Sequence, residues 1–181
     1  MKKANRIVYL VLALLFIVVA VLAILNRGDG ALKRALEENR EFQIRIDGEH
    51  KATIGLQALL DLDPQEFTTS FATSIAAPRD AVFRGVELRL VLESLGIDAS
   101  DVSHYVVSGL DSYYSPLSGD EVAREGAVYI CYSMDGEIMK TQGEGSVGPY
   151  MMVIRDSRFA QRWCKYVEAV DLILVQQGQG S

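Results

Sequence analysis

Two apolar runs, joined by a tight turn and a glycine-rich loop, make up residues 127–155, AVYICYSMDGEIMKTQGEGSVGPYMMVIR. The first run, Ala127 to Met134, is apolar on both faces of an extended chain, which predicts a strand buried in the middle of a sheet. Asp135-Gly136 predicts a hairpin turn, because glycine accepts the positive φ that such a turn requires. The loop Gln142–Gly148 leads to the second run, Tyr150 to Ile154. We expect these elements to form the core of one domain.

The rest of the chain predicts short strands and a few short helices. Leu88, Val91, Leu92 and Leu95 form one apolar helical stripe, and Gly96 follows where a C-terminal cap belongs. Two segments are expected to be loops, Ala76–Asp80 around Pro78 and Leu110–Gly119. The other expected strands are Phe42–Ile46, Glu49–Ile54, Phe67–Ile75, Tyr105–Val107 and Lys165–Val175, and the other helices are Ala31–Arg40, Leu56–Leu62 and Asp120–Glu125. The pattern is that of a mixed α+β domain.

The N-terminal segment predicts a membrane anchor. Ile7 to Leu25 is apolar throughout, and its length approaches the roughly 20 residues that a helix needs to cross a bilayer. Lys2, Lys3 and Arg6 precede it, which places the N-terminus in the cytoplasm and the domain outside. The alternative is a cleaved signal peptide, whose apolar core is shorter and ends at an Ala-x-Ala-like site. Val21-Leu22-Ala23 matches that site poorly, so the sequence favours an uncleaved anchor.

The charge of the exposed part excludes one class of partner. The first 27 residues hold four of the 18 basic residues and none of the 24 acidic ones, so the remainder has a net charge of −10. A domain this acidic does not neutralise phosphates, and we therefore expect no nucleic-acid partner. The same charge is repelled by an anionic membrane surface, which suits a domain held away from the bilayer by a stalk.

Residues with catalytic or metal-binding chemistry are sparse. Cys131 and Cys164 are either one disulfide or two small buried groups, and the sequence favours the second reading. The loop glycines lack the Gly-Lys-Ser/Thr of a phosphate-binding loop and serve a connection between strands. His104 beside Ser103 and Asp101 is only proximity in sequence, and Asp111, Asp120 and Glu121 indicate a solvated loop more than a cation site.

Five short motifs occur in a characteristic order. They are Phe83-Arg84-Gly85-Val86-Glu87-Leu88 with Gly96, Gly109–Leu117, Met134-Asp135-Gly136-Glu137, Gly148-Pro149, and Lys165-Tyr166-Val167 with Val170. In type, order and spacing they resemble the oxidoreductase molybdopterin-binding domain family, whose best-known members are the sulfite oxidases. The resemblance covers roughly residues 42–175. It implies an α+β fold, the mainly β sulfite-oxidase-like fold with short helices, here preceded by one transmembrane helix.

The apolar N-terminal segment and the resemblance together define the expected organisation of the chain. Its parts are a cytoplasmic N-terminus (1–6), a transmembrane helix (7–25), a stalk (26–40), a molybdopterin-binding-like domain (41–176) and a flexible tail (177–181).

The chain departs from the family at its metal and phosphate ligands. Catalytic members hold molybdenum with a cysteine thiolate located before the Gly-Val motif, whereas this chain has no cysteine before Cys131. The corresponding stretch, Phe67–Asp80, offers hydroxyl groups, which are poor ligands for a metal that selects a soft thiolate. His50 and His104 match no family motif, and Met151 stands where the family has a phosphate-binding arginine.

Eight residues are candidates for contact with a cofactor or other ligand, by resemblance and by position. They are Ser70, Ser74, Arg84, Asp111, Tyr113, Tyr114, Gly145 and Gly148. Tyrosines suit pocket walls because they combine an apolar ring with a polar tip. No residue is predicted to be catalytic or to ligate a metal.

The sequence supports two functions and leaves open whether the chain is an enzyme. The favoured one is a non-catalytic binding module on the outer side of the cell membrane, with no cofactor and with an unidentified small-molecule or protein partner. The alternative is a molybdopterin-dependent oxidoreductase or an electron-transfer component of a membrane redox chain.

Overall fold

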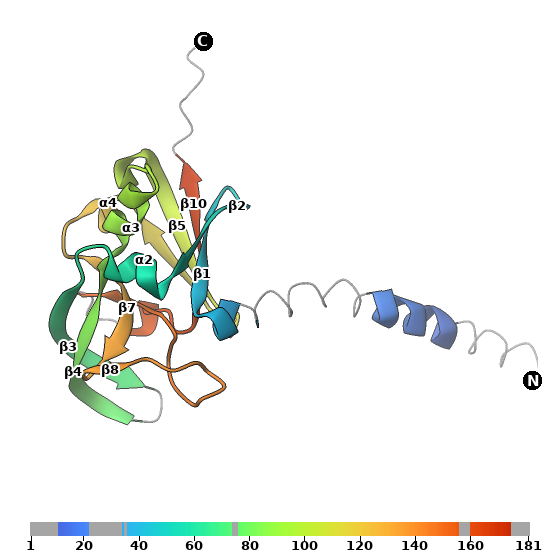
Figure 1. Cartoon of the computed structure of the whole chain (residues 1–181). Helices are drawn as coiled ribbons and strands as arrows, with labels where there is room; N and C mark the ends of the chain where they lie inside the picture. The colour runs from blue at the N-terminus through green and yellow to red at the C-terminus, as the bar shows by residue number, and fades with distance from the viewer. Residues whose placement is uncertain (1–10, 22–33, 35, 74–75, 156–159, 175–181) are drawn as a thin grey trace, which may run out of the picture. The chain divides into compact units, whose positions relative to one another are not determined.

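Two β-sheets and a few short helices follow a separate N-terminal unit (Figure 1). The computed structural model describes residues 11–21, 34, 36–73, 76–155 and 160–174. Contacts divide the chain into Met1–Ala35 and Leu36–Ser181, so the second unit begins slightly before the predicted domain start at residue 41. Residues 11–21 are helical; the remainder of the predicted span 7–25 lies outside the described residues. Within those residues, no helix is long and apolar enough to cross a membrane.

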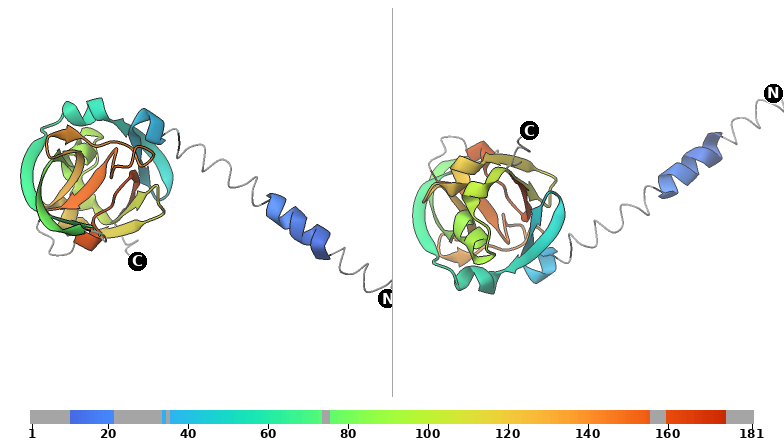
Figure 2. Two further views of the ribbon diagram at one scale, coloured as in Figure 1. Left: turned by 90° about the horizontal axis from the view of Figure 1, so that it is seen from below. Right: turned by 90° about the horizontal axis from the view of Figure 1, so that it is seen from above.

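The first sheet contains one parallel pair, β1 beside β10, and its other pairs are antiparallel. Its order is β2 (Glu49–Gly55), β1 (Glu41–Ile46), β10 (Val167–Leu174), β5 (Val102–Gly109) and β6 (Tyr114–Ser118). The second sheet has the order β3 (Gln65–Thr73), β4 (Ala76–Glu87), β7 (Val128–Met134) and β8 (Glu137–Ile138), and β9 (Met151–Ile154) also pairs with β7. The helices are α2 (Leu56–Leu60), α3 (Leu88–Ser94) and α4 (Gly119–Ala123), with 3-10 turns η1 (Ala99–Asp101) and η2 (Ala160–Arg162). In Figure 2 the strands curve around the interior of the second unit.

The predicted central strand is confirmed. β7 is buried from Val128 to Ser133 and lies between β4 on one side and β8 and β9 on the other. Asp135 and Gly136 have φ of 53° and 82°, the left-handed pair of a two-residue hairpin turn. The predicted helix is also confirmed: α3 buries Leu88, Val91 and Leu92, and Gly96 follows it with a φ of 73°.

Two predicted loops are wrong. Residues 76–80 are the first part of β4, which pairs with β3 along a hairpin that local patterning does not reveal. The pairing is irregular between Phe71 and Thr73, opposite the part of β4 that contains Pro78. Proline has no backbone N–H, and a strand tolerates it at such an irregularity. Within Leu110–Gly119, residues 114–118 form β6, because pairing with β5 satisfies their backbone.

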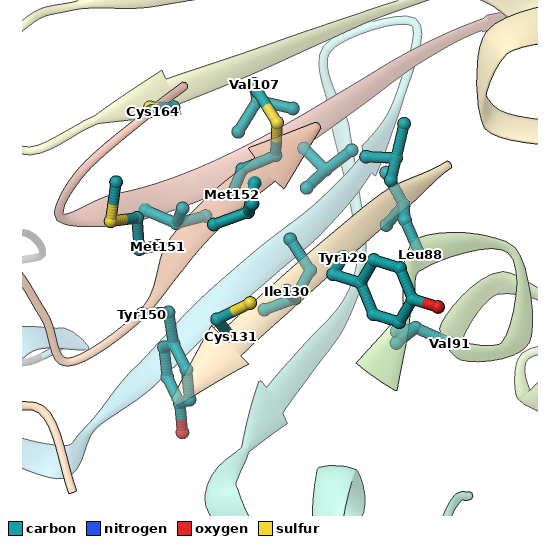
Figure 3. Packing of buried hydrophobic residues seen from close by; sticks show 14 of the residues in the cluster. Leu88, Val91, Val107, Tyr129, Ile130, Cys131, Tyr150, Met151, Met152 and Cys164 are labelled. Carbon is teal, nitrogen blue, oxygen red and sulfur yellow. The ribbon is translucent and has the colours of Figure 1, made fainter. Parts of the chain in front are cut away.

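The core is a single apolar cluster between and around the sheets (Figure 3). Both cysteines belong to it, are fully buried and are free, so the expectation of two buried apolar groups is confirmed over a disulfide. The α+β class, mainly β with short helices, is confirmed as well.

Candidate functional site

A cluster of cations and aromatic rings gathers where β3 ends and β4 begins. Phe71 of β3 stacks on Trp163, with ring centroids 6.2 Å apart and an interplanar angle of 12°. The Arg79 guanidinium carbon lies 6.0 Å from the centroid of the Phe71 ring, and Lys165 Nζ lies 5.8 Å from it. Both distances lie in the range of cation–π attraction. We call these four residues the Phe71 cluster.

Arg79 is positioned and partly neutralised by the β7–β8 turn. Its Nη2 donates to Asp135 Oδ2 at 2.7 Å, and the Asp135 Oδ1 accepts from the Val82 N–H at 3.0 Å. The Arg79 guanidinium first, and then the Val82 N–H, lower the pKa of Asp135 below its ordinary value. Among the described residues, Lys165 has no such acidic partner, so it is the uncompensated cation of the cluster.

The backbone of Lys165 is fixed by the turn that carries two predicted site residues. A Cβ on Gly109 would lie 2.6 Å from the Lys165 carbonyl oxygen and 2.7 Å from Asp111 Oδ1, so only glycine allows the turn to approach this closely. The Asp111 carboxylate accepts from the Tyr113 N–H at 3.2 Å, and the Tyr113 hydroxyl donates to the Gln161 carbonyl. Asp111 and Tyr113 therefore lie together and support the segment 161–165. Tyr114, on the edge strand β6, is 61% exposed.

Segment 164–166 also connects this turn to the glycine-rich loop. The Leu110 N–H donates to the Tyr166 carbonyl at 2.9 Å, and the Tyr166 N–H donates to the Val147 carbonyl at 3.2 Å. Val147, which precedes Gly148, is thus linked through Tyr166 to the residue that precedes Asp111.

The glycine-rich loop uses its N–H groups within the protein. The Thr141 N–H donates to Glu144 Oε2 at 2.9 Å, and the Gly143 N–H donates to Glu37 Oε1 at 3.2 Å. The N–H groups of residues 144, 145, 146 and 148 donate to backbone carbonyls between residues 140 and 142. A phosphate cradle requires free N–H groups that converge on the anion, whereas here two of them already hold carboxylates. The arrangement does not suit a phosphate.

The two candidate glycines have structural reasons to be glycine. Gly145 has a φ of 78°, which other residues rarely adopt. A Cβ on Gly148 would lie 2.5 Å from the Met139 Cβ and 3.0 Å from the Lys140 carbonyl oxygen.

Ser70 and Arg84 lie apart from the Asp111–Tyr113 turn. Both are exposed on the outward face of the β3–β4 pair, where Ser70 is opposite Asp80 and Arg84 is opposite Glu66. In the described part of the chain, neither side chain makes a hydrogen bond or an ion pair. Ser74 lies outside the described residues.

Both thiols have a raised pKa. Burial raises the pKa of Cys131 well above its ordinary value, and burial, with Asp111 and Glu168, raises the pKa of Cys164 to about 12. A buried thiol with a raised pKa is a poor nucleophile and a poor metal ligand. In the described ranges no group of three His, Cys, Asp or Glu side chains is placed to hold a metal ion. The described donors therefore do not fit a molybdenum centre held by a thiolate.

A separate depression lies at the C-terminal ends of β1 and β10. It has a volume of about 710 Å³ and shares no residue with the eight predicted positions or with the Phe71 cluster. Its lining residues are Ile46, Gly96, Ile97, Asp98, Ser100, Asp101 and Leu174.

Sequence reasoning missed all four members of the Phe71 cluster as site residues. Phe71 follows the alternation of a half-buried strand, and Arg79 lies in a segment predicted to be a loop, so neither carried a local signal. Lys165 was noted only within the motif Lys165-Tyr166-Val167. Its position after a buried Trp163-Cys164 pair was the available clue.

The comparisons with known proteins agree with this architecture. Residues 31–177 match the family described as oxidoreductase molybdopterin binding domain. Among solved structures, the chain is similar to the sulfane dehydrogenase SoxCD from Paracoccus pantotrophus, with a TM-score of 0.57 at 14% sequence identity. That match covers 74% of this chain but only 38% of the SoxCD chain, and at this identity it shows likeness of fold. The comparison with curated proteins gave no match.

Proposed function

This chain belongs to the oxidoreductase molybdopterin-binding domain family, and from that membership we propose that it is a membrane-anchored, extracytoplasmic protein whose domain is a non-catalytic binding module. The observation that carries the proposal is the state of the thiols. Cys131 and Cys164 are the only cysteines of the chain, and both are buried, which raises the pKa of each thiol. The soft, deprotonated ligand that a molybdenum site of this family requires is therefore missing.

Two further observations support the absence of a pterin phosphate. The N–H groups of the glycine-rich loop are donated to protein acceptors, among them the carboxylates of Glu37 and Glu144. The domain also carries a net charge of −10, which opposes an anionic cofactor.

The Phe71 cluster is the proposed binding surface. Arg79 is half exposed and already paired with Asp135, whereas Lys165 keeps its charge over the Phe71 ring. One uncompensated cation beside aromatic rings favours a ligand with a single carboxylate and an apolar body over a doubly charged phosphate. The Asp111–Tyr113 turn holds Lys165 in this position.

The anchor is the second part of the proposal. Ile7–Leu25 contains no charge and follows three basic residues, so we propose that it stays in the membrane with the N-terminus in the cytoplasm.

Family membership favours a second candidate, a molybdopterin-dependent oxidoreductase or an electron-transfer component of a membrane redox chain. The full chain, purified in detergent from a host that makes molybdenum cofactor, separates the two. We expect elemental analysis to find no stoichiometric molybdenum or tungsten and a pterin fluorescence assay to find no released pterin. Metal near one equivalent per chain would overturn the proposal in favour of the second candidate, and pterin without metal would indicate a carrier.

Intrinsic fluorescence tests the binding surface directly. Trp163 is the only tryptophan and stacks on Phe71, so its emission reports on the cluster. Titration with benzoate, a monocarboxylate with an aromatic body, is expected to change this emission in the wild type and not in the Lys165→Met variant. An equal response in both would exclude Lys165 as the anion contact. The location of the domain is tested by protease added to intact spheroplasts, which should digest it only if it lies outside.

A further inference from the structure

Each sheet ends in edge strands, whose outward N–H and C=O groups are able to pair with another chain. Three of these edges are protected. β2 carries Glu49, His50 and Lys51. β6 contains Pro116, whose carbonyl accepts from Arg162 at 3.0 Å. β8 is only two residues long, and the neighbouring β9 pairs with Cys164 through hydrogen bonds of 2.8 and 3.1 Å.

The edge formed by β3 has none of these devices. The strand is nine residues long, contains no proline or lysine, and has Glu66 as its single charge. It pairs with β4 without a shift of register from Gln65 to Phe71. Across residues 36–73, 76–155 and 160–174, β4 is the only strand to which the β3 backbone is hydrogen-bonded.

In the middle of β3, the side chains on the outward face are uncharged and polar. Thr68 and Ser70 are exposed there, and Thr69 is half-buried on the opposite face, between the buried Phe67 and Phe71. Threonine and phenylalanine are enriched in strands, and threonine pairs favourably with serine across neighbouring strands.

We propose that β3 is a homodimer interface, in which the β3 strands of two copies of this chain pair antiparallel about a two-fold axis at Thr69. This register places Thr68 opposite Ser70 and Phe67 opposite Phe71 of the second copy. Aromatic pairs and hydroxyl pairs directly across an antiparallel ladder are favourable. A two-fold arrangement closes after two copies and thereby removes the open edge.

The charge pattern of the strand favours a second copy as the occupant. In this register Glu66 lies opposite residue 72 of the second copy, so the only two charges of the ladder are far apart at its ends. Self-pairing therefore brings together no like charges across the ladder, although each domain is acidic overall.

The test uses the full chain in mild detergent, with mass measured by light scattering and symmetry by cross-linking. Because Cys131 and Cys164 are buried, a Thr69→Cys variant adds the only accessible thiol. Residues directly opposite in an antiparallel pair have Cα atoms about 4.5–5.5 Å apart, within reach of a disulfide. We expect copper phenanthroline to convert this variant to a covalent dimer at least about tenfold faster than the matched Thr53→Cys variant on the exposed part of β2.

Charge at the edge gives an independent measurement. In the Thr68→Lys/Ser70→Lys double variant, lysines of the two copies lie directly opposite, and the dimer is expected to dissociate at concentrations about tenfold higher than the wild type. The Thr68→Ala/Ser70→Ala variant adds no charge and should remain dimeric. A wild type that is monomeric at all concentrations, or a dimer equally stable in the lysine variant, would overturn the proposal, as would equal cross-linking at positions 69 and 53.

Discussion

The glycine-rich loop and the Phe71 cluster use their polar groups in opposite ways. The loop, with glycines at 143, 145 and 148, has the composition of a ligand cradle, yet its N–H groups are donated to Glu37, Glu144 and backbone carbonyls. The Phe71 cluster has no distinctive composition, yet it holds Lys165 without an acidic partner in the described chain. The comparison teaches that a binding surface is identified by which groups remain available, and composition alone does not reveal this.

Of the residues in these two regions, Phe71 should contribute most to the free energy of unfolding. It is buried and touches Phe83, Trp163 and two cations, so Phe71→Ala leaves a cavity and is expected to reduce the free energy of unfolding by about 3–5 kcal/mol. Chemical denaturation followed by circular dichroism measures the change. Thr68→Ala, at an exposed position of the same strand, should alter stability by less than about 0.5 kcal/mol. Similar losses in both variants would mean that the cluster is not a packed unit.

Gly148 tests whether the loop is shaped by packing. Gly148→Ala places a methyl group 2.5 Å from the Met139 Cβ, and we expect a loss of about 1–3 kcal/mol from the resulting overpacking. Gly143→Ala is the matched control, since its nearest neighbour would be Thr141 Oγ1 at 3.9 Å. Thermal unfolding of both variants checks the difference. Equal stability would show that the loop relaxes freely and is not the rigid, self-satisfied element described above.

Lys165 should matter little for stability, because a cation over a ring at a partly exposed site contributes about 0.5–1 kcal/mol. Lys165→Met is therefore expected to unfold within about 1 kcal/mol of the wild type, whereas Lys51→Met on exposed β2 should not change stability measurably. A loss as large as that of Phe71→Ala would indicate that Lys165 is a structural residue, and would contradict its role as an available cation.

Replacement of Glu144 by glutamine should change stability least, and the change should depend on pH. The Thr141 N–H, and then its hydroxyl, lower the pKa of the Glu144 carboxyl in the folded protein. A carboxyl with a lowered folded pKa contributes stability above its unfolded pKa, and this contribution disappears as the pH falls through the folded pKa. The difference in melting temperature between wild type and Glu144→Gln should thus be constant near neutral pH and vanish in acid. A difference that persists unchanged in acid would mean that Glu144 does not hold the loop through its charge.

Several features of the fold could be predicted because their signals are local. The run Val128–Met134 has both faces apolar, the Asp135-Gly136 pair supplies two left-handed residues, and the stripe ending at Gly96 has helical spacing. Each depends on neighbours within a few residues. The five motifs in sequence order then indicated the family, to which residues 31–177 belong.

The predicted site residues were recovered only in part as one region. Asp111 and Tyr113 lie together because they share one turn, and Tyr166 links the residue that precedes Asp111 to Val147, which precedes Gly148. Ser70 was chosen from the stretch that corresponds to the family's metal ligand, and Arg84 from the motif that begins at Phe83. Both lie on the outward face of a different sheet. The face of a sheet on which a side chain lies depends on the register of its strand, and the sequence alone did not give the register of β3 and β4.

The sequence by itself determined the strand periodicity, the turn residues, the helix stop and the family order, because each follows from backbone preferences within a short segment. Tertiary structure alone decided the strand that continues through Pro78, the donation of the Gly143 N–H to a residue 106 positions away and the placement of Lys165 over Phe71. These features depend on which distant segments exclude water from a group and satisfy its hydrogen bonds. Only the packed chain fixes that pairing, and with it the groups that remain free to bind.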